Sequence, residues 1–153
     1  MGQTTAARLI NCTIADNQAL YSPRTSGLYL LSNARVEIKG GIFWGNGGTG
    51  DPQIWNPGDV LPASYCILEN GLPPRISDGG GNLFSDPHFV DPRKDDYHIL
   101  SSSLAINAGD PSYQPDPGES DIDGQRRVLG GRLDIGADEV RPVQQLNRPS
   151  SLR

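Results

Sequence analysis

The chain has 153 residues, which is enough for one domain with a modest core. It contains 19 Gly and 13 Pro but only 35% hydrophobic residues, a mixture that disfavours a helical bundle and suits short strands joined by many turns. The net charge of −5 and the lack of a stripe of Lys and Arg argue against nucleic acid as a partner, and no apolar run is long enough to span a membrane.

A short phrase recurs three times in the first half of the chain. Each copy is an apolar or β-branched run that ends in asparagine, and the copies read NCTIADN at 11–17, GIFWGN at 41–46 and YCILEN at 65–70. When the final asparagines are aligned, the copies are 29 and 24 residues apart. A period of this size indicates a solenoid, in which each unit buries its apolar face by stacking on the next.

The alignment predicts which side chains stack. Ile14, Phe43 and Ile67 fall in one column. Because alternate side chains of a strand share a face, we expect this column to lie inside the stack. Each final asparagine is expected to mark a turn at the edge of a repeat, because Asn tolerates left-handed backbone angles. Equivalent asparagines would also hydrogen-bond to one another from repeat to repeat.

Further short apolar pieces lie between the phrases, namely GLYLL at 27–31, ARVEIKG at 34–40 and QIW at 53–55. Two or three strands in each repeat predict an all-β fold, a right-handed parallel β-helix of about three coils. The alternative is a β-sandwich whose unrelated strands happen to look alike. No segment shows uninterrupted helical periodicity, so we expect little or no α-helix.

The order of the phrases along the chain also carries a resemblance. The strand phrases NCTIADN, SGLYLLS, GIFWGN, DPQIW and YCIL are followed by GNLFSDPHFVDP, DDYHILSSSLAINAGDP and DIDGQRRVLGGRLDIGADE. With these phrases in this order, residues 9–139 resemble the C-terminal end of a family of secreted bacterial right-handed parallel β-helix repeat proteins with the pectate-lyase-like shape. The chain departs from the family at Leu104, where Pro is usual, and at Asn107, where Asp is usual.

The resemblance implies a longer parent protein. Family members carry many coils before this segment, so the chain is expected to be truncated at its N-terminus. They are also usually exported, which implies an extracellular or cell-surface location for the parent. The start of this chain, MGQTTAARL, lacks the apolar stretch of a signal peptide.

Four regions are expected along the chain: a lead at 1–8, the coils at 9–81, a capping segment at 82–140 and a loose tail at 141–153. The capping segment is rich in Asp, Gly and Pro with short apolar pieces. We expect it to fold over the last coil, because an uncovered end of a solenoid aggregates. Nothing in the lead can cover the first coil, so self-association through the end near 9–31 is expected.

The segment ESDIDG at 119–124 suggests a calcium site, because acidic residues alternate before a glycine. The candidate ligands are Asp121, Asp123 and Asp134. The spacing is not that of an EF-hand, and the alternative is that Asp121 and Asp123 cap turns and pair with neighbouring arginines. Calcium is the only cofactor that the sequence suggests.

The histidines and cysteines form no recognisable site. His88 and His98 lack the spacing of zinc ligands. Cys12 and Cys66 are one residue out of phase in the alignment, so we expect them to lie about two coils apart and to face opposite ways. No disulfide is expected at that separation.

Five residues are candidates for binding carbohydrate. Arg35 and Lys39 could pair with the carboxylates of an acidic sugar. The aromatic candidates, which could stack on sugar rings, are Tyr21, Trp44 and Trp55. The charges of the strand ARVEIKG alternate with apolar residues, so its simpler interpretation is a strand with one solvated face.

We therefore expect a non-catalytic module that binds an extracellular polysaccharide or a cell-surface partner. A glycoside hydrolase needs two facing carboxylates, and a polysaccharide lyase needs a base beside a charge that neutralises the uronate. Neither arrangement is evident, so no catalytic residue is assigned. The alternative is a fragment of a polysaccharide lyase or glycoside hydrolase whose catalytic coils lie upstream.

Overall fold

The computed structural model describes residues 6–19, 27–48 and 50–141. Within these residues the protein is all-β, with eleven short strands, one 3-10 turn and no α-helix. No helix in the described ranges has the length and apolar character that crossing a membrane requires. Tyr21 and the tail from residue 142 onward lie outside the described residues.

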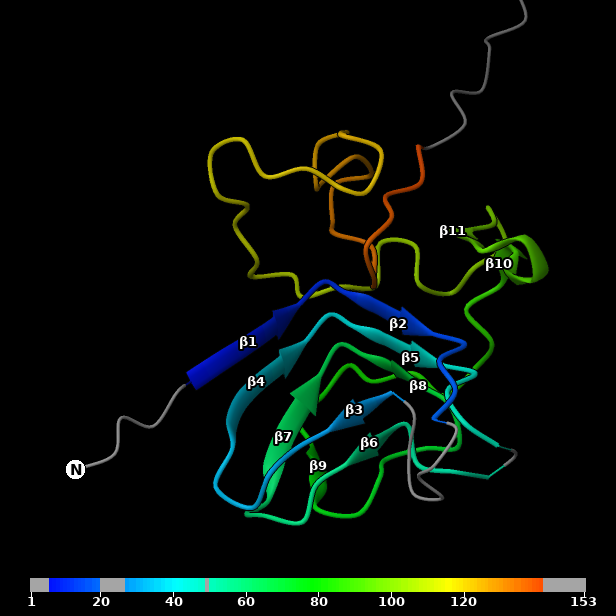
Figure 1. The fold of residues 1–153 in the computed structure, drawn as a ribbon. Helices are drawn as coiled ribbons and strands as arrows, with labels where there is room; N and C mark the ends of the chain where they lie inside the picture. The colour runs from blue at the N-terminus through cyan, green and yellow to red at the C-terminus, as the bar shows by residue number, and fades with distance from the viewer. Residues whose placement is uncertain (1–5, 20–26, 49, 142–153) are drawn as a thin grey trace, which may run out of the picture.

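Three parallel sheets contain nine of the strands (Figure 1). Sheet A consists of β1 (Ala6–Ile10), β4 (Arg35–Lys39), β7 (Leu61–Ser64) and β9 (Ile76–Asp78). Sheet B consists of β2 (Thr13–Ala15), β5 (Ile42–Trp44) and β8 (Ile67–Leu68), and sheet C of β3 (Leu28–Tyr29) and β6 (Ile54–Trp55). The other two strands, β10 (Phe89–Asp91) and β11 (Asp96–Ile99), form an antiparallel hairpin around the 3-10 turn η1 (Pro92–Lys94).

The chain visits the three sheets in a repeating order, and we call each passage a rung. The first rung is β1, β2 and β3, the second is β4, β5 and β6, and the third is β7 and β8, after which β9 returns to sheet A. Each strand lies parallel to its equivalent in the previous rung, as Figure 1 shows for β1, β4 and β7. This arrangement is compatible with a solenoid-like fold and differs from the antiparallel sheets of a β-sandwich.

The expected column of stacked side chains is confirmed for two repeats and wrong for the third. Ile14 pairs with Phe43, but Phe43 pairs with Leu68 rather than with Ile67. Because the side-chain period of a strand is two, this slip of one residue places Ile67 on the opposite face of sheet B.

After each strand of sheet B the chain turns sharply, and we call this turn the corner. The residues at this corner explain both the repeated asparagine and the one-residue displacement of the third repeat. Asp16, Gly45 and Asn70 have left-handed backbone angles there, with φ of 52°, 68° and 63°. Asp, Gly and Asn adopt this region at the lowest cost. In the first two rungs an asparagine follows the corner residue, whereas in the third rung Asn70 is itself the corner residue. Aligning the asparagines therefore displaces the third repeat by one residue.

The asparagines of the first two rungs hydrogen-bond to each other, as expected. The side-chain oxygen of Asn46 accepts from the backbone and side-chain nitrogens of Asn17 at 3.1 and 2.9 Å. Asn46 and Gln53 are both buried and bond to each other, and Gln53 Nε2 donates to Glu69 Oε2 at 3.0 Å. In the third rung, Glu69 thus continues the polar ladder that Asn70 was expected to continue.

An apolar core joins the three sheets. Its buried members are Leu30, Ile38, Phe43, Ile54, Ala63, Cys66, Leu68 and Ile76. Every rung contributes to this cluster, so the stacking of rungs is what removes these side chains from water.

A second apolar cluster covers the opposite face of sheet B. Ile42 and Ile67 point away from the inner core and pack against Ile99, Ala105 and Ile135. These three partners belong to the C-terminal segment, which we define as residues 82–141. Sheet B is therefore buried on both faces. A sheet with one face exposed to water would carry polar side chains on that face.

The C-terminal segment was expected to fold over the last coil, and it does so only at its start, where Leu83 pairs with Ile67 of β8. The segment then lies along the side of the stack and reaches the first rung. The Ala137 N–H donates to Thr13 Oγ1 at 3.1 Å, and the Gly136 N–H donates to the Gly40 carbonyl at 2.8 Å. Gly136 has a φ of 107°, and a Cβ there would lie 2.7 Å from Ile42 Cδ1, so glycine permits this close approach. Figure 1 shows the segment above the junction of sheets A and B.

The corrected register also changes the placement of the cysteines. Cys12 and Cys66 occupy equivalent positions with Gly41 between them, so they face the same way and not opposite ways. Both thiols are free. Two strand spacings separate equivalent positions by about 9.6 Å, which is too far for a disulfide.

The two thiols are expected to react at different rates. Burial raises the pKa of the Cys66 thiol to about 11, and the side chain is fully buried, whereas Cys12 is only half-buried. Alkylation of the native protein at pH 8 should therefore modify Cys12 first and leave Cys66 intact until the protein unfolds. Peptide mapping by mass spectrometry measures both sites, and equal labelling of the two cysteines in the native protein would contradict the burial of Cys66.

Candidate functional site

A groove of about 540 Å³ runs along the outer face of sheet A. Its lining residues come from β1, β4 and β7 alone. On β4 the charged side chains of Arg35, Glu37 and Lys39 point outward, while Val36 and Ile38 pack in the inner core. Arg35 and Lys39, two candidate carbohydrate-binding residues, thus lie in one groove.

The cationic side chains of this groove differ in whether a carboxylate of the protein already pairs with them. Arg8 Nε donates to Glu37 Oε2 at 2.7 Å across neighbouring strands. Lys39 Nζ forms an ion pair with Asp110 Oδ2 at 2.5 Å, and the Asp110 side chain is only 7% exposed. Arg35 is exposed and forms no ion pair within the described ranges. Arg35 is therefore the cation of the groove that a ligand can most readily engage.

The candidate aromatic residues lie elsewhere. Trp55 pairs with Tyr29 across β3 and β6, and Tyr29 is 55% exposed on the outer side of sheet C. Trp44 packs against the second apolar cluster, beneath the C-terminal segment. The expected carbohydrate-binding residues are thus divided between different surfaces, and the exposed partner of Trp55 is Tyr29, which the sequence did not single out.

The three candidate calcium ligands do not converge on one point. Asp121 accepts from the backbone N–H groups of Asp123 and Gln125 at 3.0 and 2.7 Å, so it caps a turn. Both oxygens of the buried Asp134 also accept backbone N–H groups, at 2.6 and 2.8 Å. Asp123 is exposed and contacts His98. Among the described ion pairs, none joins Asp121 or Asp123 to an arginine.

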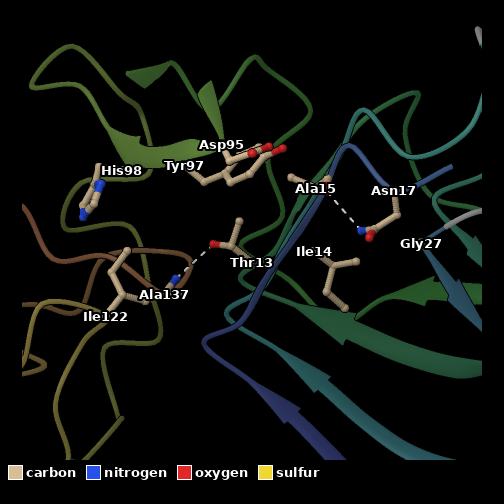
Figure 2. Close-up of a pocket in the computed structure, with 10 residues that line it drawn as sticks. All are labelled: Thr13, Ile14, Ala15, Asn17, Gly27, Asp95, Tyr97, His98, Ile122 and Ala137. Atoms are coloured by element: carbon tan, nitrogen blue, oxygen red, sulfur yellow. Dashed lines mark hydrogen bonds between the residues drawn. The ribbon is translucent and has the colours of Figure 1, made fainter. Parts of the chain in front are cut away.

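A cleft of about 610 Å³ separates the edge of sheet B from the β10–β11 hairpin (Figure 2). One wall consists of β2, including Thr13, Ile14 and Ala15, and the other carries Tyr97 and His98 of β11. Figure 2 shows the hydrogen bond from the Ala137 N–H to Thr13, which joins the C-terminal segment to β2 beside the cleft. The cleft exists because the C-terminal segment, after Leu83, docks beside sheet B.

His98 stands at one side of this cleft among carboxylates. Its Nδ1 lies 2.6 Å from Asp96 Oδ1, and its Nε2 lies 3.2 Å from Asp123 Oδ1. The hydrogen bond with Asp96 is the main reason why the pKa of His98 is raised, and it also lowers the pKa of Asp96. Within the described residues, His98, Asp123 and Asp138 form the group whose ligand atoms could surround a metal ion.

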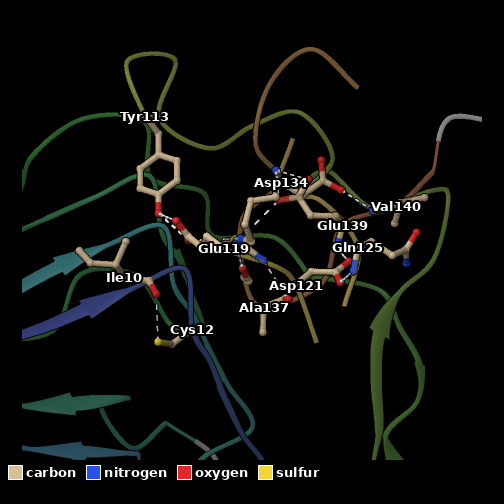
Figure 3. A network of polar contacts seen from close by, with 12 residues as sticks. Ile10, Cys12, Tyr113, Glu119, Asp121, Gln125, Asp134, Ala137, Glu139 and Val140 are labelled. Carbon is tan, nitrogen blue, oxygen red and sulfur yellow. Dashed lines mark hydrogen bonds and ion pairs between the residues drawn. The ribbon is translucent and has the colours of Figure 1, made fainter. Parts of the chain in front are cut away.

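A buried polar network holds the C-terminal segment together (Figure 3). Arg127 is 3% exposed and lies 3.8 Å from both Glu119 and Glu139, and it donates to the carbonyls of Gly136 and Ala137 at 2.8 and 2.9 Å. These bonds tie the segment between 119 and 139 into one unit. They also give the buried guanidinium several acceptors, which offsets the cost of burying its charge.

The same network shifts three acidic groups. Burial, followed by the negative charge of Asp134, raises the pKa of Glu139 to about 8 despite the nearby Arg127. Burial likewise raises the pKa of Asp134. The phenol of Tyr113 is partly buried and donates to the Glu119 carboxylate at 2.6 Å, which raises the pKa of Tyr113 to about 12. Glu139 is therefore mostly protonated at neutral pH.

No protein-family model, curated protein or solved structure matches this chain.

Proposed function

We propose that this chain is the C-terminal part of a secreted bacterial protein with a right-handed parallel β-helix of the pectate-lyase-like shape. The support comes from the repeated route of the chain through three parallel sheets and from the left-handed corner residue that recurs after sheet B in each rung. The sequence phrases of the C-terminal segment add to this support, because they follow the order found in that family.

The module is non-catalytic and binds an acidic extracellular polysaccharide along the outer face of sheet A. The observation that carries this proposal is the exposed Arg35 in the groove along β4, which forms no ion pair with any described residue. A guanidinium forms two parallel hydrogen bonds with a carboxylate, and a uronate polymer presents carboxylates at regular intervals. Arg8 and Lys39 also line the groove, but Glu37 and Asp110 neutralise them, so Arg35 carries the attraction.

The two glutamates beside Arg127 do not support cleavage of the polysaccharide. Glu119 and Glu139 each approach Arg127 at 3.8 Å. Glu139 is only 2% exposed, and Tyr113 donates its hydroxyl to the Glu119 carboxylate. A sugar cannot reach both groups, so neither takes the role of general acid or nucleophile.

Binding to polygalacturonate, with dextran as the neutral comparison, tests this function. At low ionic strength the protein should be retarded by immobilised polygalacturonate and not by dextran, because the attraction is mainly electrostatic. Arg35→Gln should weaken binding about tenfold, as expected for one charged hydrogen-bonding group. Arg93→Gln is the matched control, because Arg93 is an exposed arginine on η1, outside the groove.

Two results would overturn the proposal. If Arg35→Gln and Arg93→Gln bind as tightly as the unaltered protein, the groove is not the binding surface. If incubation with polygalacturonate releases unsaturated or reducing ends, the chain is an enzyme and the lyase or hydrolase alternative replaces the binding module.

A further inference from the structure

Three separate parts of the C-terminal segment bring ligand atoms together beside the cleft. His98 lies on β11, Asp123 in the turn at 121–124, and Asp138 near the end of the segment. Each offers one ligand atom, and these atoms all lie within 4.8 Å of one another. This arrangement is a product of the fold, because the three residues are far apart in the sequence.

Asp138 supplies an observation that hydrogen bonding alone does not explain. The residue is only 6% exposed, and its Oδ2 accepts the Ile99 N–H at 2.8 Å. No donor among the described residues reaches its other oxygen. The second oxygen of this carboxylate is therefore available as a ligand atom, and it lies near the His98 ring and the Asp123 carboxylate.

The imidazole of His98 is oriented as metal-binding imidazoles are. Asp96 lies outside the three-residue group and bonds to Nδ1 at 2.6 Å, which leaves Nε2 directed toward Asp123. Histidine ligands usually donate their other ring N–H to a carboxylate in this way. A metal ion bound here takes the place of the Nε2 proton that otherwise bonds to Asp123, so binding releases that proton.

We propose that His98, Asp123 and Asp138 bind a divalent transition-metal ion, and that Zn²⁺ fits the donor set best. Zn²⁺ takes imidazole nitrogen and carboxylate oxygen readily, and three protein ligands leave a fourth position open. Ca²⁺ is disfavoured because it prefers six to eight oxygen ligands. The site does not depend on carbohydrate binding, because it lies on the C-terminal segment and not on sheet A.

The present separations require one adjustment. Ligand atoms around a tetrahedral Zn²⁺ lie about 3.3 Å apart, so the 3.2 Å between His98 Nε2 and Asp123 Oδ1 already fits. Asp138 is held by the Ile99 N–H, whereas the Asp123 side chain is 48% exposed in a turn. The turn is therefore the part that moves to close the site. The bound ion would join β11, this turn and the end of the segment.

Titration of the full chain with Zn²⁺ tests the site. Protein prepared without a histidine tag and treated with chelator is expected to bind one equivalent of Zn²⁺ by calorimetry, and its melting temperature should rise as binding saturates. His98→Gln and Asp123→Asn should each lower the affinity at least about 100-fold, and Asp96→Asn about tenfold, because Asp96 only orients the ring. Substitution by Co²⁺ adds a visible absorption band that reports the ligand field directly.

The chain offers matched controls for each change. His88→Gln removes the other histidine, which bonds to Ser102, and Asp116→Asn removes an exposed carboxylate outside the group. Both should bind Zn²⁺ like the unaltered protein. The proposal is overturned if Zn²⁺ does not bind, if binding survives both His98→Gln and Asp123→Asn, or if Ca²⁺ binds in its place. Retained circular dichroism of the variants shows that lost affinity does not reflect unfolding.

Discussion

Replacing Lys39 by Met is expected to lower the free energy of unfolding by about 2 to 3 kcal/mol. The Lys39 ammonium lies 2.5 Å from Asp110, in a pair whose side chains are 29% and 7% exposed. Removing the cation leaves the Asp110 carboxylate buried with Ser112 as its remaining hydrogen-bond donor. Because this pair joins β4 to the C-terminal segment, the loss should appear as weaker docking of that segment. Denaturant unfolding measures the change.

The matched control is Lys94→Met. Lys94 forms an ion pair with Asp91 at 2.7 Å, but its side chain is 81% exposed. Screening by water makes such a pair worth less than about 1 kcal/mol, so this change should have little effect. Equal effects of Lys39→Met and Lys94→Met would contradict the burial of the Lys39–Asp110 pair.

The Lys39–Asp110 pair should also leave a signature at acidic pH. Burial tends to raise the pKa of Asp110, but the hydrogen bonds from Lys39 and Ser112 outweigh it and the pKa is lowered. A lowered pKa means that the stabilisation is present above the unfolded value of about 3.9 and is lost as the pH falls through the folded value. The difference between Lys39→Met and the unaltered protein should therefore shrink below about pH 4.

Replacing Glu139 by Gln is expected to stabilise the protein at alkaline pH by several kcal/mol. The folded pKa of Glu139 is about 8, raised from 4.5 mainly by burial. The folded state therefore holds this proton more tightly than the unfolded state does. Stability consequently falls as the pH rises from about 4.5 to 8, and each tenfold difference in proton affinity is worth about 1.4 kcal/mol. Gln mimics the protonated carboxyl and removes this fall.

Unfolding curves between pH 5 and 9, recorded with a chelator present, measure the effect. Near pH 5 the two proteins should differ little, and the gap should widen up to about pH 9. Glu37→Gln is the control, because Glu37 is exposed beside Arg8 on sheet A. A constant difference between Glu139→Gln and the unaltered protein across this pH range would show that Glu139 is already ionised in the folded state.

The sequences of β5 and β8 indicate that another segment covers the outer face of sheet B. Ile42 and Phe43 are consecutive apolar residues, as are Ile67 and Leu68, and consecutive apolar residues in a strand indicate burial on both faces. The prediction of a cap over the last coil missed this signal. The cleft beside β2 and the group around His98 form only because the C-terminal segment docks on the outer face of sheet B.

The carbohydrate and calcium candidates show where sequence reasoning stops. The alternation of charged and apolar residues along β4 correctly predicts that Arg35 and Lys39 share one outer face, because the periodicity of a strand depends only on neighbouring residues. The alternating acidic residues at 119–124 suggest that Asp121 and Asp123 bind one calcium ion together. In the structure, Asp121 caps a turn and Asp123 approaches His98. In irregular structure, which side chains meet depends on the path of the whole segment, and no local period describes that path.

By itself the sequence determined the all-β class and the parallel stacking of rungs, because both follow from short apolar runs that recur at a spacing of 24 to 29 residues. The structure places the left-handed corners of the first two rungs at Asp16 and Gly45, one residue before the asparagines that the sequence suggested. Only the tertiary structure decided the register of the third rung, since Asn70 can occupy either of two adjacent corner positions. It also decided that Lys39 meets Asp110 and that His98 meets Asp138. These contacts arise from side chains that are distant in the sequence, and the packing of Ile42 and Ile67 against the C-terminal segment brings them together.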